Sequence, residues 1–484
     1  MNSRSKHSES SHAAVMLQVM KKGAVSPMVA LVVLFALATS SLALDEVAAK
    51  ATQNASQASD PQVRNGGEVN EGILPVPNYS GDLWSRSYLS GDWRGTRSDL
   101  AEKGIQADVQ FVQIFQSVVD GGRKTGTKYG GTLDYNLTLD FDRMGFIPGG
   151  LVTFRGESRY GETVNGIAGP LLPANLDGML PLTRELDDNV GFTITNLNYT
   201  QFLSEQAGVM IGKFDTLQGD SNEFASGRGV SQFMNYNLVT NAPGAYPVGY
   251  SVLGGGFFVV PGEQISIMNF LFTTQDSSTT SGFDNFDDGW TWNTEIYGQY
   301  ELGRLPGGLM GGVTYSFDAD FARLNGLYVP SSGGGITTTT EDETWSVYFN
   351  GWQYIFAEKA AKGPVDVTNG KQDYQGVGLF GRIAFADKDV NPVKFFASVG
   401  LGGRGVIPGR DNDTFGVGYF YQDIVTSRLA DRLGFEDNSQ GFEAYYNFAI
   451  SPSSFLTSDI QVLDAPFTEL DTAVVLGMRL KVVF

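Results

Sequence analysis

Strict alternation of apolar and polar residues is the feature that most constrains the fold of this chain. Apolar side chains occupy every second position of residues 133–141, and polar ones such as Asp134, Asn136 and Asp140 lie between them. The same alternation recurs in residues 152–160, 290–301, 377–385, 415–421 and 442–450. Because successive side chains of a strand point to opposite faces, each segment is predicted to be a β-strand with one apolar and one polar face.

The chain ends on a further strand of this kind. Its apolar residues are Val474, Leu476, Met478, Leu480, Val482 and Phe484, whereas Arg479 and Lys481 fall on the other face. A soluble β-sandwich also alternates, but a last strand that ends on an aromatic residue is typical of outer-membrane barrels. We therefore predict an all-β fold, a transmembrane antiparallel β-barrel of about 16 strands. A short N-terminal helix is predicted from about Thr96 to Lys103, ended by Gly104.

Composition excludes several functional classes. After the first fifty residues there is no apolar run of roughly 18 residues, as a spanning helix requires. The formal net charge of −20 argues against a nucleic-acid partner. Cysteine is absent and the histidines are His7 and His12, ahead of the predicted mature chain, so we expect no metal, no cofactor and no enzymatic activity. An outer-membrane or secreted hydrolase that uses carboxylates is a remote alternative.

The N-terminus has the order of a secretory signal. Lys21 and Lys22 precede an apolar stretch, Val29 to Ala38, and small residues follow up to Ala43. This order predicts a signal peptide over residues 1–43, with translation starting at Met20. Residues 44–83 lack periodicity and are predicted to be a flexible lead-in, which leaves 84–484 for the barrel. The predicted location is therefore the outer membrane of a Gram-negative type of cell.

Turns and loops divide between the two ends of such a barrel. The Pro-Gly-Gly sequences at 148–150 and 306–308 and the segment 451–454 suit short periplasmic turns. The longer stretches suit extracellular loops, and they comprise residues 161–189, 215–247, 273–289 and 329–344.

Three charged residues on one strand are the main candidates for the wall of a pore. If Phe154 and Tyr160 face lipid, then Arg155, Glu157 and Arg159 face the lumen, where they could form a charged constriction. A structural ion-pair ladder is the alternative interpretation. Further candidates for the lumen are Lys213, Arg382, Arg404, Arg410, Glu443 and Arg479. Phe484 is the candidate signal for the barrel-assembly machinery.

Four segments resemble the carbohydrate-selective outer-membrane porin family of the OprB type. They are Gly91-Asp92-Trp93-Arg94-Gly95-Thr96-Arg97, Gly402 to Tyr419, Glu443 to Gln461, and Ala473 to Leu480. The resemblance implies a 16-stranded barrel in outer-membrane lipid that lets monosaccharides and similar small sugars diffuse passively through water. A general, non-selective porin is the alternative, and the sequence leaves open whether the barrel works alone or as a homotrimer.

Overall fold

The computed structural model describes residues 72–262, 264–326, 329–330, 336–358, 374–432 and 434–484. The predicted signal peptide, the start at Met20 and most of the lead-in lie outside these residues. Among the described residues, no helix is both long enough and apolar enough to cross a bilayer.

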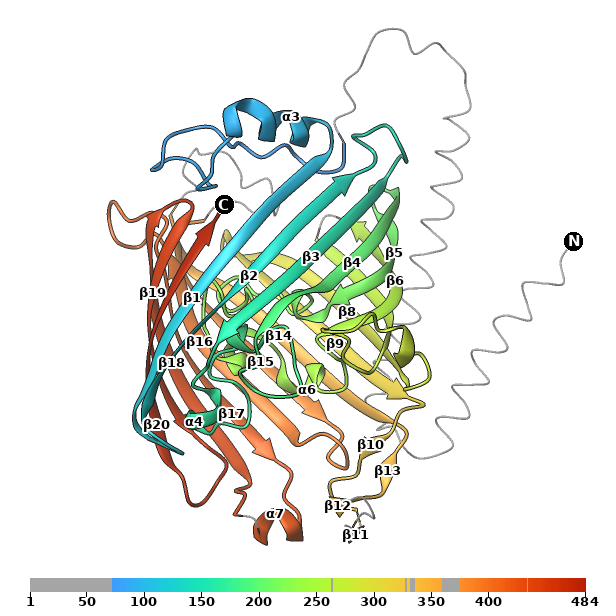
Figure 1. Cartoon of the computed structure of the whole chain (residues 1–484), viewed down its shortest axis with the longest axis vertical. Helices are drawn as coiled ribbons and strands as arrows, with labels where there is room; N and C mark the ends of the chain where they lie inside the picture. The colour runs from blue at the N-terminus through green and yellow to red at the C-terminus, as the bar shows by residue number, and fades with distance from the viewer. Residues whose placement is uncertain (1–71, 263, 327–328, 331–335, 359–373, 433) are drawn as a thin grey trace, which may run out of the picture. The chain divides into compact units, whose positions relative to one another are not determined.

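Sixteen antiparallel strands form a closed barrel in chain order (Figure 1). They are β1 (Ile105–Gly122), β2 (Gly126–Asp140), β3 (Gly150–Gly161), β4 (Val190–Ser204), β5 (Ala207–Asp215), β6 (Ser251–Gly262), β7 (Ile265–Thr273), β8 (Trp290–Leu302), β9 (Leu305–Phe317), β14 (Thr344–Ala357), β15 (Gly376–Ala386), β16 (Val393–Arg404), β17 (Thr414–Ile424), β18 (Asn438–Ser451), β19 (Ser454–Asp464) and β20 (Asp471–Val483). The last strand pairs with the first, with Leu480 opposite Gln113, so neither strand leaves an open edge. The predicted fold is confirmed.

Shorter elements lie in the connections. Two small ladders pair β10 (Phe321–Ala322) with β13 (Thr340–Glu341) and β11 (Val329–Pro330) with β12 (Ile336–Thr337). The helical segments are η1 (Trp93–Gly95), α3 (Thr96–Glu102), α4 (Asn165–Ala168), η2 (Asp177–Met179), η3 (Thr216–Gln218), α5 (Tyr236–Val239), α6 (Ala242–Ala245), η4 (Phe283–Asn285) and α7 (Arg428–Arg432). The predicted N-terminal helix corresponds to α3, and Gly104 follows it with a φ of +88°.

The two faces of the barrel invert the arrangement of a soluble protein. Large apolar side chains such as Ile211, Leu309 and Val399 are exposed on the outer surface, as a lipid-facing wall requires. Polar side chains, among them Thr314 and Gln461, are buried on the inside. The alternation of the sequence therefore becomes an apolar outer face and a polar inner face.

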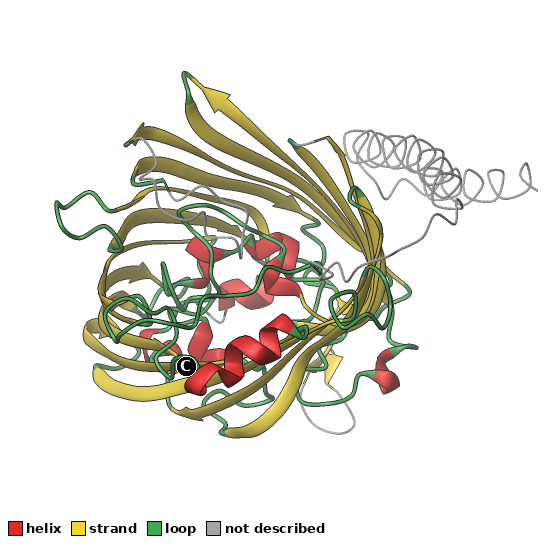
Figure 2. Ribbon diagram, turned by 90° about the horizontal axis from the view of Figure 1, so that it is seen from above, coloured by secondary structure: helices red, strands yellow, loops and turns green. Residues whose placement is uncertain are grey.

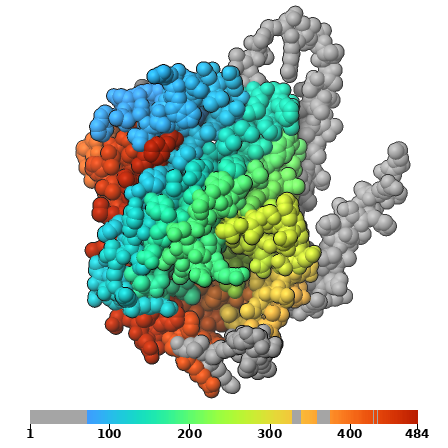
Figure 3. Space-filling model, in the orientation of Figure 1, coloured from blue at the N-terminus to red at the C-terminus, as the bar shows by residue number. Residues whose placement is uncertain are grey.

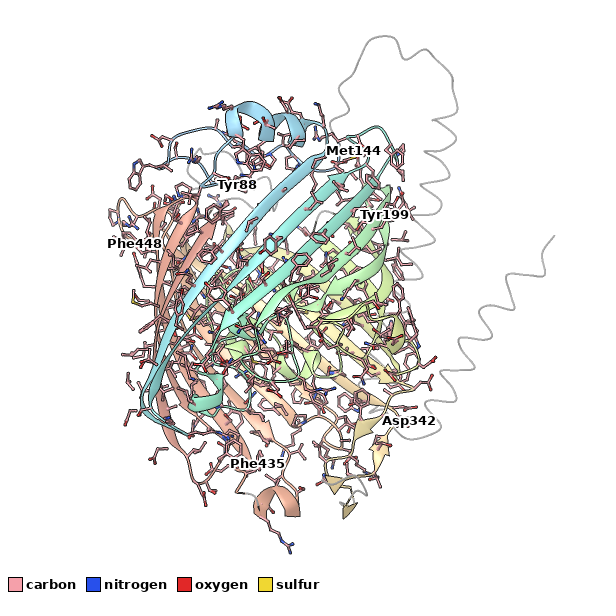
Figure 4. All side chains as sticks on the ribbon, in the orientation of Figure 1. Tyr88, Met144, Tyr199, Asp342, Phe435 and Phe448 are labelled. Atoms are coloured by element: carbon pink, nitrogen blue, oxygen red, sulfur yellow. The ribbon has the colours of Figure 1, made fainter. Side chains whose placement is uncertain are left out.

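The two ends of the barrel differ in their connections. One end has turns of two residues at 205–206, 303–304 and 452–453, and the other end has the long segments 162–189, 216–250, 274–289 and 318–343. Figure 4 labels Met144, Tyr199 and Phe448 toward the first end, and Asp342 and Phe435 at the second. Short turns are typical of the periplasmic side, which assigns the long segments to the cell exterior.

One predicted turn is wrong in its position. Pro306 to Gly308 lie within strand β9, and the turn before them is formed by Gly303 and Arg304 instead. Both turn residues have a positive φ, of 59° and 70°. A left-handed two-residue turn matches the twist of the flanking strands, and the proline that follows occupies the beginning of a strand.

Two of the long connections, segments 162–189 and 216–250, fold into the barrel. Figure 2 shows short helices inside the ring of strands. Segment 162–189 carries α4 and η2, and segment 216–250 carries η3, α5 and α6. Their apolar residues form a buried core with side chains of the wall, including Phe233, Leu238, Phe380 and Phe420. This core narrows the lumen.

The N-terminal segment covers the periplasmic end of the first strands (Figures 1 and 3). Arg97 of α3 is buried there between the rings of Tyr79 and Tyr88, with 4.3 Å from its guanidinium carbon to each ring centre. It donates hydrogen bonds to the carbonyl oxygens of Ala107 (2.6 Å) and Phe484 (3.0 Å). The amide of Phe484 donates to the carbonyl oxygen of Val109 (2.8 Å), so this segment fastens the seam of the barrel.

Candidate functional site

Against the inner wall of the barrel lies an arginine that is surrounded by carboxylates. Arg228, from the inward segment 216–250, lies 3.1 Å from Asp134, 2.7 Å from Glu157 and 3.5 Å from Asp215. These carboxylates belong to β2, β3 and β5, so one loop side chain joins three strands of the wall. Burial works against the charge of Arg228, but Tyr250 and the three carboxylates outweigh it and raise the pKa of this arginine well above its ordinary value.

Arg155, Glu157 and Arg159 of strand β3 all lie on the inner face of the barrel, but they contact different groups. Arg155 forms an ion pair with Asp215 and keeps 17% of its side chain exposed. Glu157 accepts from Arg228 and from the Tyr250 hydroxyl at 2.5 Å. Arg159 is 4% exposed and donates to loop oxygens, including Thr183 Oγ1 at 2.6 Å. Arg155 therefore contacts water most, whereas Glu157 and Arg159 hold the inward loops.

Three of the other candidate residues also form hydrogen bonds with segment 216–250. Arg382 of β15 donates to Asp220 (2.9 Å) and to backbone carbonyls, including that of Ala225 (2.6 Å). Glu443 of β18 accepts the backbone amides of Met234 (2.6 Å) and Asn235 (2.9 Å). Arg479 of β20 donates to the carbonyl oxygens of Gly229 and Gln232. These charged groups lie on the inner face, as the alternation predicts, and the loop covers them.

Two candidates do not lie on the inner face. Lys213 is opposite Leu197 in the β4–β5 register, on the same side of the sheet as exposed Ile211. Its ammonium donates to the carbonyl oxygens of Ser277 and Thr280, because segment 274–289 folds over this part of the outer wall. A lumenal Lys213 is therefore a wrong assignment: a lysine on this face is satisfied by loop carbonyls rather than by water.

Arg410 is likewise misassigned, and Arg404 is peripheral. Arg410 lies in the periplasmic connection 405–413, where it donates to Asp413 (2.8 Å and 2.6 Å) and packs 3.6 Å from the ring centre of Phe448. Arg404 ends β16 at the same mouth and donates to Asn412 at 2.8 Å. Whether a residue has an odd or an even position, its parity, decides the face to which it points only within a strand. Arg410 lies in a turn, so parity could not place it.

The other inward segment, 162–189, adds a buried carboxyl group next to this cluster. Asp177 of η2 accepts the Thr132 hydroxyl at 2.6 Å. Burial first, and then the nearby charge of Asp134, raise the pKa of Asp177 to about 7, against the partial compensation of Thr132 and Arg228. The docking of segment 162–189 is thus coupled to the protonation of one carboxyl group.

A cavity of about 270 Å³ lies beside the charged cluster. Inner-face residues of β4, β5, β7, β8 and β14 line one side, and segment 216–250 lines the other. Three carboxylates, those of Asp215, Asp220 and Glu295, border it together with phenylalanine rings. Polar groups opposite an apolar wall are what a site for a small polar organic molecule provides.

Sequence reasoning missed Arg228, Asp215 and the cavity. Arg228 lies between Gly227 and Gly229 in a segment without periodicity, where parity offers no signal. Asp134 had been noticed only as part of the alternating pattern. Among the described residues, no group of three or more acidic or histidine side chains is arranged to hold a metal ion.

Comparison with known proteins agrees with the barrel fold. The model of a family described as carbohydrate-selective porin, OprB family, matches residues 124–484. Porin B of Pseudomonas aeruginosa is 22% identical over 434 residues, which cover 82% of this chain and 91% of that protein. The high-pH structure of Pseudomonas putida OprB has a TM-score of 0.69 at 18% identity, covering 84% of this chain and 100% of that one. The low-pH structure gives 0.50 at 17% identity, with 83% and 99% covered.

Proposed function

This chain belongs to the OprB family of carbohydrate-selective porins, and from that premise we propose that its selectivity arises where segment 216–250 crosses the lumen. The chain is an outer-membrane porin that lets small sugars diffuse passively through a β-barrel. Family and fold indicate a channel rather than an enzyme.

The observation that carries the proposal is the fixed array of opposite charges around Arg228. Arg155 and Arg228 share Asp215, and both arginines are held at the inner wall by buried partners. Charges that are already paired present donors and acceptors without a strong net field, so a neutral sugar can exchange water for them and leave again. Arg155 is the member that retains contact with solvent, and we assign it to the pathway.

We assign the remaining inner-face residues to a supporting role. Glu157, Arg159, Arg382, Glu443 and Arg479 set the width of the passage by fixing the loops rather than by touching the sugar. Phe484 is proposed as the signal that the barrel-assembly machinery recognises, before the N-terminal segment covers the seam.

The test is Arg155→Gln in protein reconstituted into liposomes, because glutamine retains hydrogen-bonding groups but removes the lumenal charge. We expect a folded barrel, a shift of ion selectivity toward cations and a lower ratio of glucose flux to that of a similar-sized solute with few hydroxyls. Arg304→Gln, at an exposed periplasmic turn, is the matched control. If both variants keep the sugar ratio and the ion selectivity of the wild type, Arg155 does not line the constriction.

A further inference from the structure

The cavity beside the charged cluster has a wall of aromatic and thioether side chains. Phe214, Phe270 and Phe272 pack together, with ring centres 5.5 Å, 5.6 Å and 5.0 Å apart, and Met210 and Met268 extend the same surface. The volume of about 270 Å³ corresponds to roughly nine water molecules. That is the size range of one monosaccharide ring, whose C–H face suits an apolar wall.

The polar side of this cavity carries three carboxyl groups, and arginines pair with two of them. Its lining, as far as the structure describes it, contains three carboxylates and no lysine or arginine. Asp215 is paired with arginine, and so is Asp220, whose partner Arg382 lies 2.9 Å away. Glu295 instead accepts from the hydroxyls of Tyr297 (2.5 Å) and Tyr348 (2.7 Å). No cation of the described residues pairs with Glu295, so the cavity is acidic.

Two asparagine side chains in the lining of this cavity have an amide oxygen that accepts no hydrogen bond. Asn198 and Asn241 are 6% and 2% exposed, and the side-chain oxygen of each has no hydrogen-bond partner among the described residues. Buried polar atoms rarely go unpaired, because an unmade hydrogen bond costs about 1–3 kcal/mol. Each of these oxygens is almost completely covered, so a donor in the cavity reaches it only when the amide group turns toward the cavity.

From this chemistry we propose that the cavity is a monosaccharide subsite that accepts neutral and amino sugars and disfavours sugar acids and sugar phosphates. The phenylalanine wall contacts the apolar face of the ring, and the hydroxyls or the ammonium group donate to Glu295 and, once their amides turn toward the cavity, to the two asparagines. An anionic sugar brings a second negative charge beside Glu295 and adds no donor. The inference rests on the proposed sugar pathway and deepens it by naming the class of sugar.

The experiment measures the permeability of reconstituted full-length protein to three sugars of matched size: glucose, glucosamine and glucuronate. The wild type should admit glucosamine at least as fast as glucose, and glucuronate most slowly. Glu295→Gln keeps an acceptor for the tyrosine hydroxyls but removes the charge. We expect it to lower the glucosamine-to-glucose ratio and raise the glucuronate-to-glucose ratio, each by roughly threefold.

Glu301→Gln is the matched control, since Glu301 lies on the same strand and the same face at its exposed periplasmic end. Asn198→Leu is a second variant, which should slow glucose while leaving the order set by charge intact. If Glu295→Gln behaves like Glu301→Gln while the wild type still selects sugars over a solute with few hydroxyls, the subsite is refuted and the proposed pathway survives. If the wild type shows no such selection, both are refuted.

Discussion

Removal of the charge of Arg228 should release the inward segment without opening the barrel. Arg228→Met keeps much of the length of the side chain, but it leaves Asp134, Glu157 and Asp215 without their shared cation. The pairs are 3.1 Å, 2.7 Å and 3.5 Å long, and no partner side chain is more than 5% exposed. Loss of one partner from a buried ion pair costs about 3–5 kcal/mol, since the remaining charge stays desolvated.

That cost falls on the docking of segment 216–250, because the strand ladder does not involve Arg228. Each 1.36 kcal/mol is a factor of ten, so the undocked population should rise roughly 10²- to 10⁴-fold. We expect higher single-channel conductance in planar bilayers, faster proteolysis within 216–250 and unchanged heat-modifiability of the barrel.

The control is Arg323→Met. Arg323 pairs with Glu341 at 3.0 Å, but the two side chains are 43% and 35% exposed, and such a pair contributes about 0–1 kcal/mol. Wild-type conductance and protease resistance in Arg228→Met would show that the cluster does not hold the segment, and the reasoning would be refuted.

Three further predictions test the loop, the wall and the seam. The raised pKa of Asp177, about 7 against an ordinary 3.8, means that docking of 162–189 is most stable at low pH and weakens by roughly 1.4 kcal/mol per unit as pH rises toward 7. The protection factors of amides in this segment, corrected for the intrinsic pH dependence of exchange, should therefore fall from pH 5 to pH 7.5, and Asp177→Asn should abolish that fall. Leu137→Arg, on the lipid face, should cost up to about 2–4 kcal/mol of barrel stability in urea titrations, whereas Thr138→Arg should fold and alter conductance; equal folding defects would contradict the assignment of faces. Deletion of Phe484 should lower the amount of heat-modifiable barrel in outer-membrane fractions, and normal amounts would count against its role in assembly.

Alternation along the chain was sufficient to predict the barrel and the orientation of most of its wall. Parity is a local property, because a strand turns its side chains to opposite faces whatever lies around it. Arg155, Glu157 and Arg159 could therefore be assigned to the inner face from their neighbours Phe154 and Tyr160 alone. The same rule failed for Arg410, which lies in a turn.

What covers the inner face was decided only by the tertiary structure. Arg228 is 94 residues from Asp134 and 71 from Glu157 in the chain, and it comes from a segment with no periodic signal. Parity can place a charge inside the barrel, but it cannot tell a side chain in water from one that holds a loop. Lys213 was wrongly expected in the lumen: it lies on the face of exposed Ile211, and only the fold shows that segment 274–289 satisfies its charge there. The sequence by itself determined the barrel, because strand geometry is repeated residue by residue; the constriction and the cavity depend on contacts between distant segments, which only the folded chain brings together.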